Sequence, residues 1–114
     1  MPDKFGDKAR LLHVLDAIQA INGYTKELNF EDFSNNSMVC DACLRQLSII
    51  GEATNRISEE ITKKFPGISW RQIIGLRNIV IHQYFGVDQQ VIWNVIKVDL
   101  PDLRVKVEQV LDSL

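Results

Sequence analysis

The stretch CLRQLSIIGEATNRI, residues 43–57, decides the fold, because its apolar residues recur in alternating steps of four and three. Continued by one more step, the stripe consists of Cys43, Leu47, Ile50, Thr54, Ile57 and Ile61. This spacing suits packing against another long helix at a shallow angle. We therefore predict one long helix that follows the turn-rich segment 29–36 and ends near Lys64, before Pro66-Gly67.

The rest of the chain also follows the helical period, and no stretch alternates as a strand would. Two further helices are predicted from about Asp7 to Leu28 and from Trp70, capped by Ser69, to about Tyr84. A fourth helix begins after a cap at Asp88. The last helix begins at Asp99, with Pro101 in its first turn. Their predicted stripes are Leu11, Leu15, Ile18 and Asn22, broadened by Leu12; then Val91, Ile92, Val95 and Ile96; and finally Leu100, Leu103, Val107, Val110 and Leu114. The pattern predicts an all-α up-and-down bundle of four or five helices.

Length and composition indicate a single domain, residues 1–114, since 13.1 kDa leaves no room for a second one. Hydrophobic residues make up 46% and charged residues 25%, which is typical of a soluble globular protein. No apolar run approaches the ~20 residues that span a bilayer, and the first residues show no signal-peptide pattern. We expect a cytoplasmic protein that does not contact a membrane.

The charge balance argues against binding of nucleic acid by bulk positive charge. The formal net charge is −2 and the pI is about 5.6, whereas phosphate neutralisation needs clustered Lys and Arg. A small basic cleft, particularly one assembled between two copies of the chain, is compatible with this balance.

The two cysteines, Cys40 and Cys43, form a C-x-x-C pair. Such a pair resembles thioredoxin-type and zinc motifs, but no strand precedes it and no second pair completes four ligands. Because Cys43 falls on the apolar stripe, we predict that it packs in the core. We expect neither a metal nor a cofactor.

Unusual polar residues gather in the segment RNIVIHQY, residues 77–84. On a continuous helix Arg77 lies inside an apolar sector, which is unfavourable unless the guanidinium is paired or opens onto a cleft. Glu52 and Asp41 are both candidate partners for it. Asn78 and His82 share a neighbouring polar face with Arg71, a possible contact for RNA phosphate.

Arginine and histidine together have the chemistry for cleaving RNA without a metal. An imidazole can donate and accept protons near neutral pH, and a guanidinium matches phosphate oxygens while it stays charged. Arg77 and His82 are about 140° apart around one helix, so their side chains need not converge. Two antiparallel copies across a twofold axis would bring two such sets to one cleft. The alternative is a structural ion pair and a hydrogen-bonded core histidine.

The sequence R-N-x-x-x-H-x-Y, followed by the segment 85–88 and the Val-Ile-Trp helix, resembles the HepT-like family of HEPN-domain ribonuclease toxins. The segments 50–53 and 56–58, Trp70 and the Leu100-Pro101 helix start also resemble that family, so the similarity covers most of the chain. The resemblance implies a HEPN-like α-helical homodimer and a metal-independent endoribonuclease that acts on RNA inside the cell.

The resemblance also implies a role for individual residues and a partner. Arg77 and His82 would be catalytic, Asn78 would support them, and Tyr84 would be the site of AMPylation. The partner would be a minimal nucleotidyltransferase antitoxin that transfers AMP from ATP to the tyrosine. A noncatalytic helical dimer that binds such a nucleotidyltransferase and its nucleotide is the main alternative, and a purely structural helical partner is another.

Overall fold

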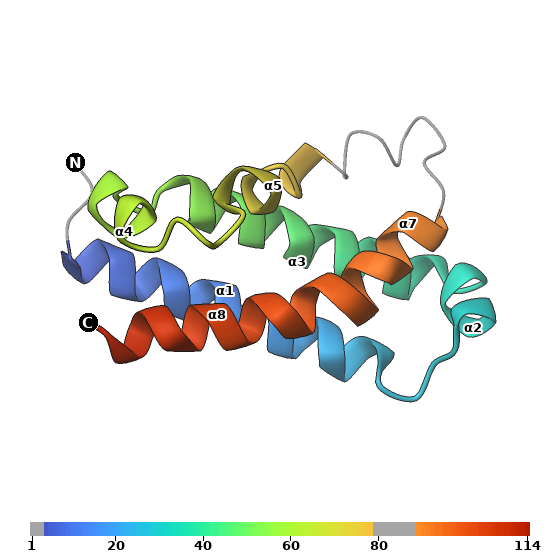
Figure 1. Cartoon of the computed structure of the whole chain (residues 1–114). Coiled ribbons are helices and arrows are strands. Elements are labelled where there is room, and N and C mark those ends of the chain that lie inside the picture. The colour runs from blue at the N-terminus through green and yellow to red at the C-terminus, as the bar shows by residue number, and fades with distance from the viewer. Residues whose placement is uncertain (1–3, 79–88) are drawn as a thin grey trace.

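The computed structural model describes residues 4–78 and 89–114, and every regular element among them is helical. The elements are α1 (Lys4–Thr25), α2 (Phe30–Ser34), α3 (Ser37–Asn55), α4 (Glu59–Lys64), α5 (Trp70–Ile74), α7 (Gln89–Asn94), the π-helical turn η1 (Val95–Asp99) and α8 (Leu100–Asp112). The predicted all-α bundle is confirmed (Figure 1). None of the described helices combines the length and apolarity that a membrane span requires.

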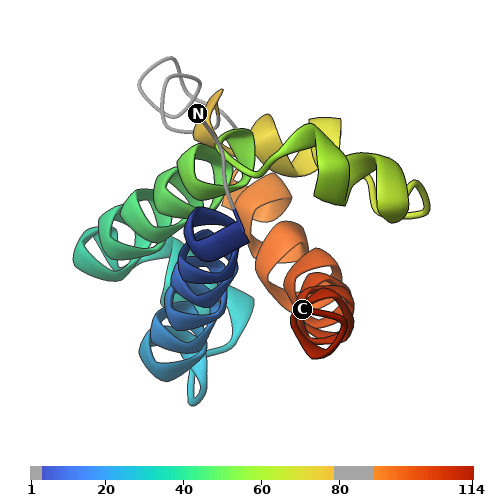
Figure 2. The same ribbon diagram turned by 90° about the vertical axis from the view of Figure 1, so that its left-hand side faces the viewer.

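Three long helices enclose the core. Figure 2 shows α1 between α3 and α8, with the chain from α4 to α5 lying across the open side of α3 and α8. The predicted stripe of α3 is confirmed, because its six residues from Cys43 to Ile61 are all buried. Both cysteines are buried and free, as expected of core residues.

The predicted stripe of the first helix is only partly confirmed: Leu11 and Ile18 are buried and Leu15 packs against the core, but Leu12 and Asn22 do not. The buried apolar residues of this helix are Leu11, Val14, Ala17, Ile18 and Ile21, whereas Leu12 is 42% exposed and Asn22 also faces solvent. The helix begins at Lys4 and ends at Thr25, where the hydroxyl donates to the Ile21 carbonyl at 2.9 Å. The buried stripe therefore runs through Leu11, Val14, Ile18 and Ile21, in steps of three, four and three.

The predicted helix ending near Lys64 is two helices. The chain leaves α3 after Asn55, and Ser58 caps α4 by accepting from the Ile61 amide. The segment predicted as turn-rich contains the short helix α2, which Asn29 and Asp32 close with a reciprocal capping box. Phe33 of α2 is fully buried and its ring lies 5.0 Å from that of Trp93.

The C-terminal half of the bundle is one uninterrupted helical run from Gln89 to Asp112, so the predicted helix start at Asp99 is wrong. Asp99 has helical dihedral angles and makes no side-chain cap. The Leu100 amide donates to the Val95 carbonyl, five residues earlier, which defines a π turn directly before Pro101. A widened turn relieves the clash that a proline ring makes with the preceding turn. Val91 and Leu114 are exposed, in contrast to the prediction.

Candidate active site

The helix that was predicted to continue from Trp70 to Tyr84 is interrupted just before Arg77. Helix α5 ends at Ile74, and Gly75 and Leu76 form a turn held by short-range amide bonds. The Asn78 amide donates to the Gly75 carbonyl at 2.9 Å, so a helical conformation resumes at Arg77. The angular relation predicted between Arg77 and the residues of α5 is therefore wrong.

Gly51 of α3 fixes the position of the Arg77 backbone. A Cβ atom on Gly51 would lie 2.8 Å from the Arg77 amide nitrogen and 2.9 Å from the Ile74 carbonyl oxygen. Real Cβ atoms do not approach backbone atoms so closely, so only glycine allows this contact. The turn that carries Arg77 is thus seated directly on the surface of α3.

The Arg77 guanidinium pairs with Glu52, the residue after this glycine. Arg77 Nη1 lies 3.2 Å from Glu52 Oε1, and the two side chains are 38% and 53% exposed. Of the two acids considered from the sequence, the structure selects Glu52, since Asp41 lies about 16 Å further along the axis of α3. An ion pair this exposed leaves the guanidinium accessible to a ligand from solution.

Glu52 also lines a groove of about 450 Å³ between α1 and α3. The other groove residues are Gly6, Ala9, Arg10 and His13 of α1, and Ser48, Ile49, Ala53 and Arg56 from α3 and its C-cap. Because Glu52 lines the groove and also pairs with Arg77, Arg77 lies at the margin of this groove. His13 is exposed and lines the groove together with Arg10 and Arg56, which nothing in the spacing along the chain indicates.

The other predicted site residues are only partly placed. Arg71 on α5 and Asn78 are exposed. His82 and Tyr84 lie outside the described residues. Within the described ranges, no group of three or more His, Cys, Asp or Glu side chains could hold a metal ion.

The C-x-x-C pair has the properties of packed core thiols. Burial raises the pKa of the Cys43 thiol from its ordinary value of 9.0 to about 12, and Cys40 nearby reinforces the shift. Burial also raises the pKa of Cys40, and the Asp41 carboxylate adds to this effect. Both groups are therefore uncharged thiols near neutral pH, whereas a nucleophile or metal ligand must be a thiolate.

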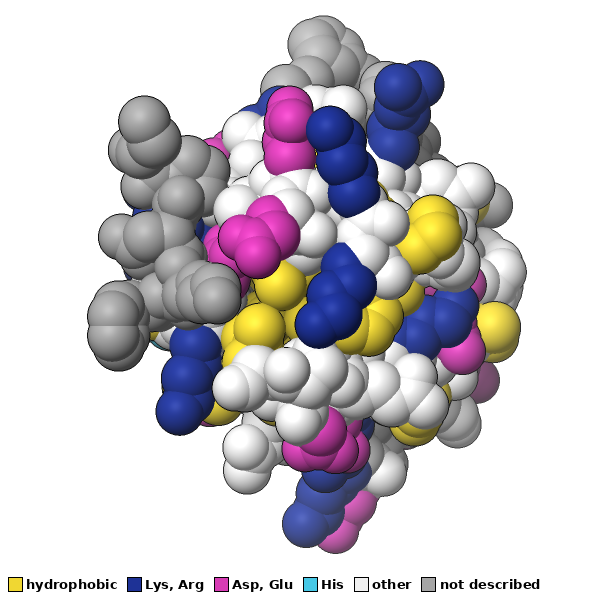
Figure 3. Space-filling view, turned by 60° about the vertical axis from the view of Figure 1, so that its left-hand side comes forward, with side chains coloured by type: hydrophobic (Ala, Val, Ile, Leu, Met, Phe, Trp, Pro, Cys, Tyr) yellow, Lys and Arg dark blue, Asp and Glu magenta, His cyan; other side chains and the backbone are white. Residues whose placement is uncertain are grey.

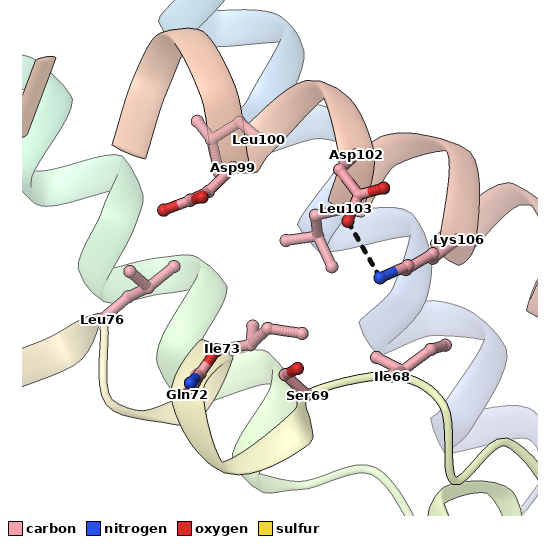
Figure 4. A pocket seen from close by; sticks show the side chains of 10 residues that line it. All are labelled: Ile68, Ser69, Gln72, Ile73, Leu76, Asp99, Leu100, Asp102, Leu103 and Lys106. Atoms are coloured by element: carbon pink, nitrogen blue, oxygen red, sulfur yellow. Dashed lines mark ion pairs between the residues drawn. The ribbon is translucent and has the colours of Figure 1, made fainter. Parts of the chain in front are cut away.

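A second, smaller cavity of about 120 Å³ lies between α5 and the start of α8. In Figure 4, Ile73 and Leu103 project into it from opposite walls, while the Asp102–Lys106 ion pair, 2.9 Å long, lies along its edge. Its other charged lining residue is Asp99. The one lysine among these lining residues is paired with Asp102, and the two aspartates outnumber it, so the cavity offers no excess of positive charge to a phosphate.

The surface as a whole is not basic. Figure 3 shows Lys and Arg side chains interspersed with Asp and Glu over the face that it presents, with hydrophobic side chains visible between them. This mixture agrees with the net charge of −2. Any attraction for a polyanion must therefore come from a local arrangement such as the groove beside Arg77.

Comparison with known proteins shows to which family this chain belongs. The family model described as "Ribonuclease HepT-like" matches residues 14–110. The chain belongs to the ribonuclease HepT-like family, which confirms the resemblance seen in its motif. No solved structure matches the chain significantly.

Several curated proteins are similar over nearly their whole length. The chain is 40% identical to "Putative RNase MJ1380" of Methanocaldococcus jannaschii, over 89% of this chain and 93% of that protein. It is 39% identical to "Probable ribonuclease HepT" of Thermococcus cleftensis, over 93% and 96%. It is also 35% identical to "Putative RNase TTE0752" of Caldanaerobacter subterraneus, over 90% and 92%.

Proposed function

We propose that this protein is a metal-independent endoribonuclease that acts as the toxin of a toxin–antitoxin pair in the cytoplasm. The observation that carries the proposal is the Arg77 guanidinium, which the structure holds half-exposed beside a groove, in a chain of the ribonuclease HepT-like family. The relatives named as ribonucleases support the same activity.

The proposed chemistry needs only a base, an acid and a cation. The 2′-hydroxyl of RNA attacks the adjacent phosphorus, its proton moves to an imidazole of His82, and the bond to the 5′-oxygen breaks. A protonated imidazole supplies the proton to that leaving oxygen. Arg77 stabilises the charge that develops on the phosphoryl oxygens through N–H donors that remain charged at any physiological pH. In a homodimer, the second protomer would contribute its own Arg77 and His82 to the same cleft, with Asn78 in support.

The test is cleavage of RNA by the purified protein with EDTA present. Arg77→Ala and His82→Ala should each abolish cleavage and growth arrest while the helical content stays unchanged. Arg104→Ala is the matched control, since this exposed arginine of α8 pairs only with Glu108 one turn away among the described residues. Cleavage retained by both site variants would refute the proposal. Absence of cleavage by the parent protein at any pH would favour a noncatalytic dimer that binds a nucleotidyltransferase.

We further propose that a minimal nucleotidyltransferase inhibits the protein by AMPylating Tyr84. The tyrosine oxygen attacks the α-phosphorus of ATP, the bond to the β-phosphate breaks, pyrophosphate leaves and the phenolic proton is released. The attached AMP adds bulk and negative charge to the same segment as Arg77, where it would compete with RNA phosphate. Coexpression with a cognate nucleotidyltransferase should add AMP mass to the peptide that contains Tyr84, and Tyr84→Phe should stay unmodified and toxic.

A further inference from the structure

The groove between α1 and α3 differs from the rest of the surface in its charge. Its lining contains Arg10, Arg56 and His13 but only one acid, Glu52, and that carboxylate is already paired with Arg77. The groove therefore carries a local excess of positive charge on a chain whose net charge is −2. Such a local excess attracts a polyanion even when the whole protein does not.

The arginine of α1 is held in place before any ligand binds. Arg10 Nη1 donates to the Arg56 carbonyl at 3.1 Å, where α3 ends. A guanidinium has five N–H donors, so this single bond leaves others for phosphate oxygens. A side chain that is already oriented loses less conformational entropy on binding.

The groove floor allows a close approach. Gly6, Ala9, Ser48 and Ala53 line the groove and have little side-chain volume. A sugar-phosphate backbone could therefore lie along the groove with its phosphates against guanidinium groups, which match phosphate geometry. Glu52 lies between Ser48 and Arg56 among the groove residues of α3, and its ion pair joins the groove to Arg77.

We infer that this groove binds the backbone of a single RNA strand and leads it to the scissile phosphate at Arg77, with Arg10 and Arg56 as the main phosphate contacts and His13 as a further donor. This inference rests on the proposed ribonuclease function. RNA is favoured over an acidic protein partner because the groove adjoins the proposed catalytic arginine.

The test is the affinity of the full-length protein for a fluorescein-labelled single-stranded RNA with 2′-O-methyl groups, which cannot be cleaved. Each single-strand phosphate contact contributes about 0.7 to the salt slope, so losing one should weaken binding about fivefold at ~0.1 M salt. Arg10→Gln and Arg56→Gln should each show this loss and a correspondingly shallower slope. Arg10→Lys should retain most of the affinity, and Arg104→Gln on α8 should match the parent protein.

The outcomes separate this inference from the proposed function. If Arg10→Gln and Arg56→Gln both leave the RNA affinity and its salt slope unchanged, the groove is not the RNA-binding site, even if cleavage still depends on Arg77 and His82. The same holds if these variants lose only their binding to the nucleotidyltransferase. Weaker RNA binding by the groove variants, with a parent protein that binds but does not cleave, would support the groove and contradict the ribonuclease.

Discussion

The Arg77 guanidinium is held by an ion pair and still remains accessible to a ligand. Its only described ion-pair partner is Glu52, and both side chains are too exposed for the pair to contribute much to stability. The role of the pair is therefore orientation: the guanidinium is directed toward α3 and the groove, and part of its surface stays in solvent. Of the two conditions expected for an arginine on an apolar helix face, pairing is met by Glu52, and the side chain also stays partly exposed.

Gly51 gives the first prediction at this scale. Gly51→Ala should push the Arg77 turn away from α3, because its Cβ would overlap the Arg77 amide and the Ile74 carbonyl. We expect a loss of about 2 kcal/mol in the free energy of unfolding, together with a large loss of RNA cleavage. Urea unfolding and a cleavage assay measure the two effects.

Gly23→Ala is the matched control. Gly23 lies within α1 and an added Cβ would have no neighbour within 4 Å. Alanine should therefore stabilise the helix by about 0.5–1 kcal/mol and leave cleavage unchanged. Equal behaviour of the two alanine variants would show that the close contact between α3 and the Arg77 turn does not hold in solution.

The raised pKa of Cys43 makes stability depend on alkaline pH. The folded state keeps the thiol protonated up to about pH 12, while the unfolded chain releases the proton near the ordinary value of 9.0. Folding is thus favoured fully below pH 9, and this contribution decreases as the pH rises through the interval to 12. The decrease should be about 1.4 kcal/mol per pH unit once the unfolded thiol has ionised.

Urea unfolding at pH 7, 9 and 10 checks this effect. Cys43→Ala should be less stable at pH 7, because a buried group is lost, but its stability should decrease less between pH 9 and pH 10. Parallel pH profiles for the parent protein and this variant would contradict the assignment.

At the scale of elements, the helical period predicted the bundle but not the breaks within it. The stripe of α3 continues through Ile57 to Ile61, and both are buried although the helix ends at Asn55 and restarts at Glu59. Periodicity reports which side chains face the core and does not detect a turn that preserves that face. The signal for the break was Ser58 followed by two glutamates, a typical helix start.

The same limitation applies to the candidate site. The buried stripe could be predicted and Arg77 singled out, because both depend on residue type and spacing, whereas the choice of Glu52 over Asp41 as its partner could not be made from the sequence. The groove could not be predicted either, since Arg10 and Arg56 meet only when α1 packs on α3. Likewise, the turn at Gly75-Leu76 depends on the contact of Gly51 with the Ile74 carbonyl, which is a tertiary interaction.

The break between α3 and α4 is stabilised by a buried carboxylate from α1, and this contact gives the third prediction. Asp7 is 1% exposed and accepts hydrogen bonds from the Ser58 amide at 2.8 Å and from the Ser58 hydroxyl at 2.6 Å. Asp7→Ala leaves both donors buried without this acceptor and should lower the free energy of unfolding by about 2–3 kcal/mol. Thermal or urea unfolding measures the loss.

Asp16→Ala on the exposed face of α1 is the control and should change stability by less than about 0.5 kcal/mol. A similar small change for Asp7→Ala would mean that α4 is held by its apolar residues alone.

At the scale of the whole molecule, a single protomer offers one basic groove and one Arg77 on a chain that is otherwise slightly acidic. A twofold arrangement would double the positive charge around one RNA strand and supply the second Arg–His set that the proposed mechanism uses. The proposed mechanism thus includes a dimer, and subunit exchange can test it directly.

Mixing inactive protomers provides the fourth prediction. Arg77→Ala retains His82, and His82→Ala retains Arg77, so a mixed dimer has one intact guanidinium and one intact imidazole from different protomers. If both groups reach a common cleft, mixing the two purified variants should restore part of the RNA cleavage that neither shows alone. Mass spectrometry of differently tagged protomers verifies the exchange, and mixing each variant with a tagged copy of itself is the control. Exchange without any recovery would show that each protomer needs its own Arg77 and His82, and the shared-cleft mechanism would then be wrong.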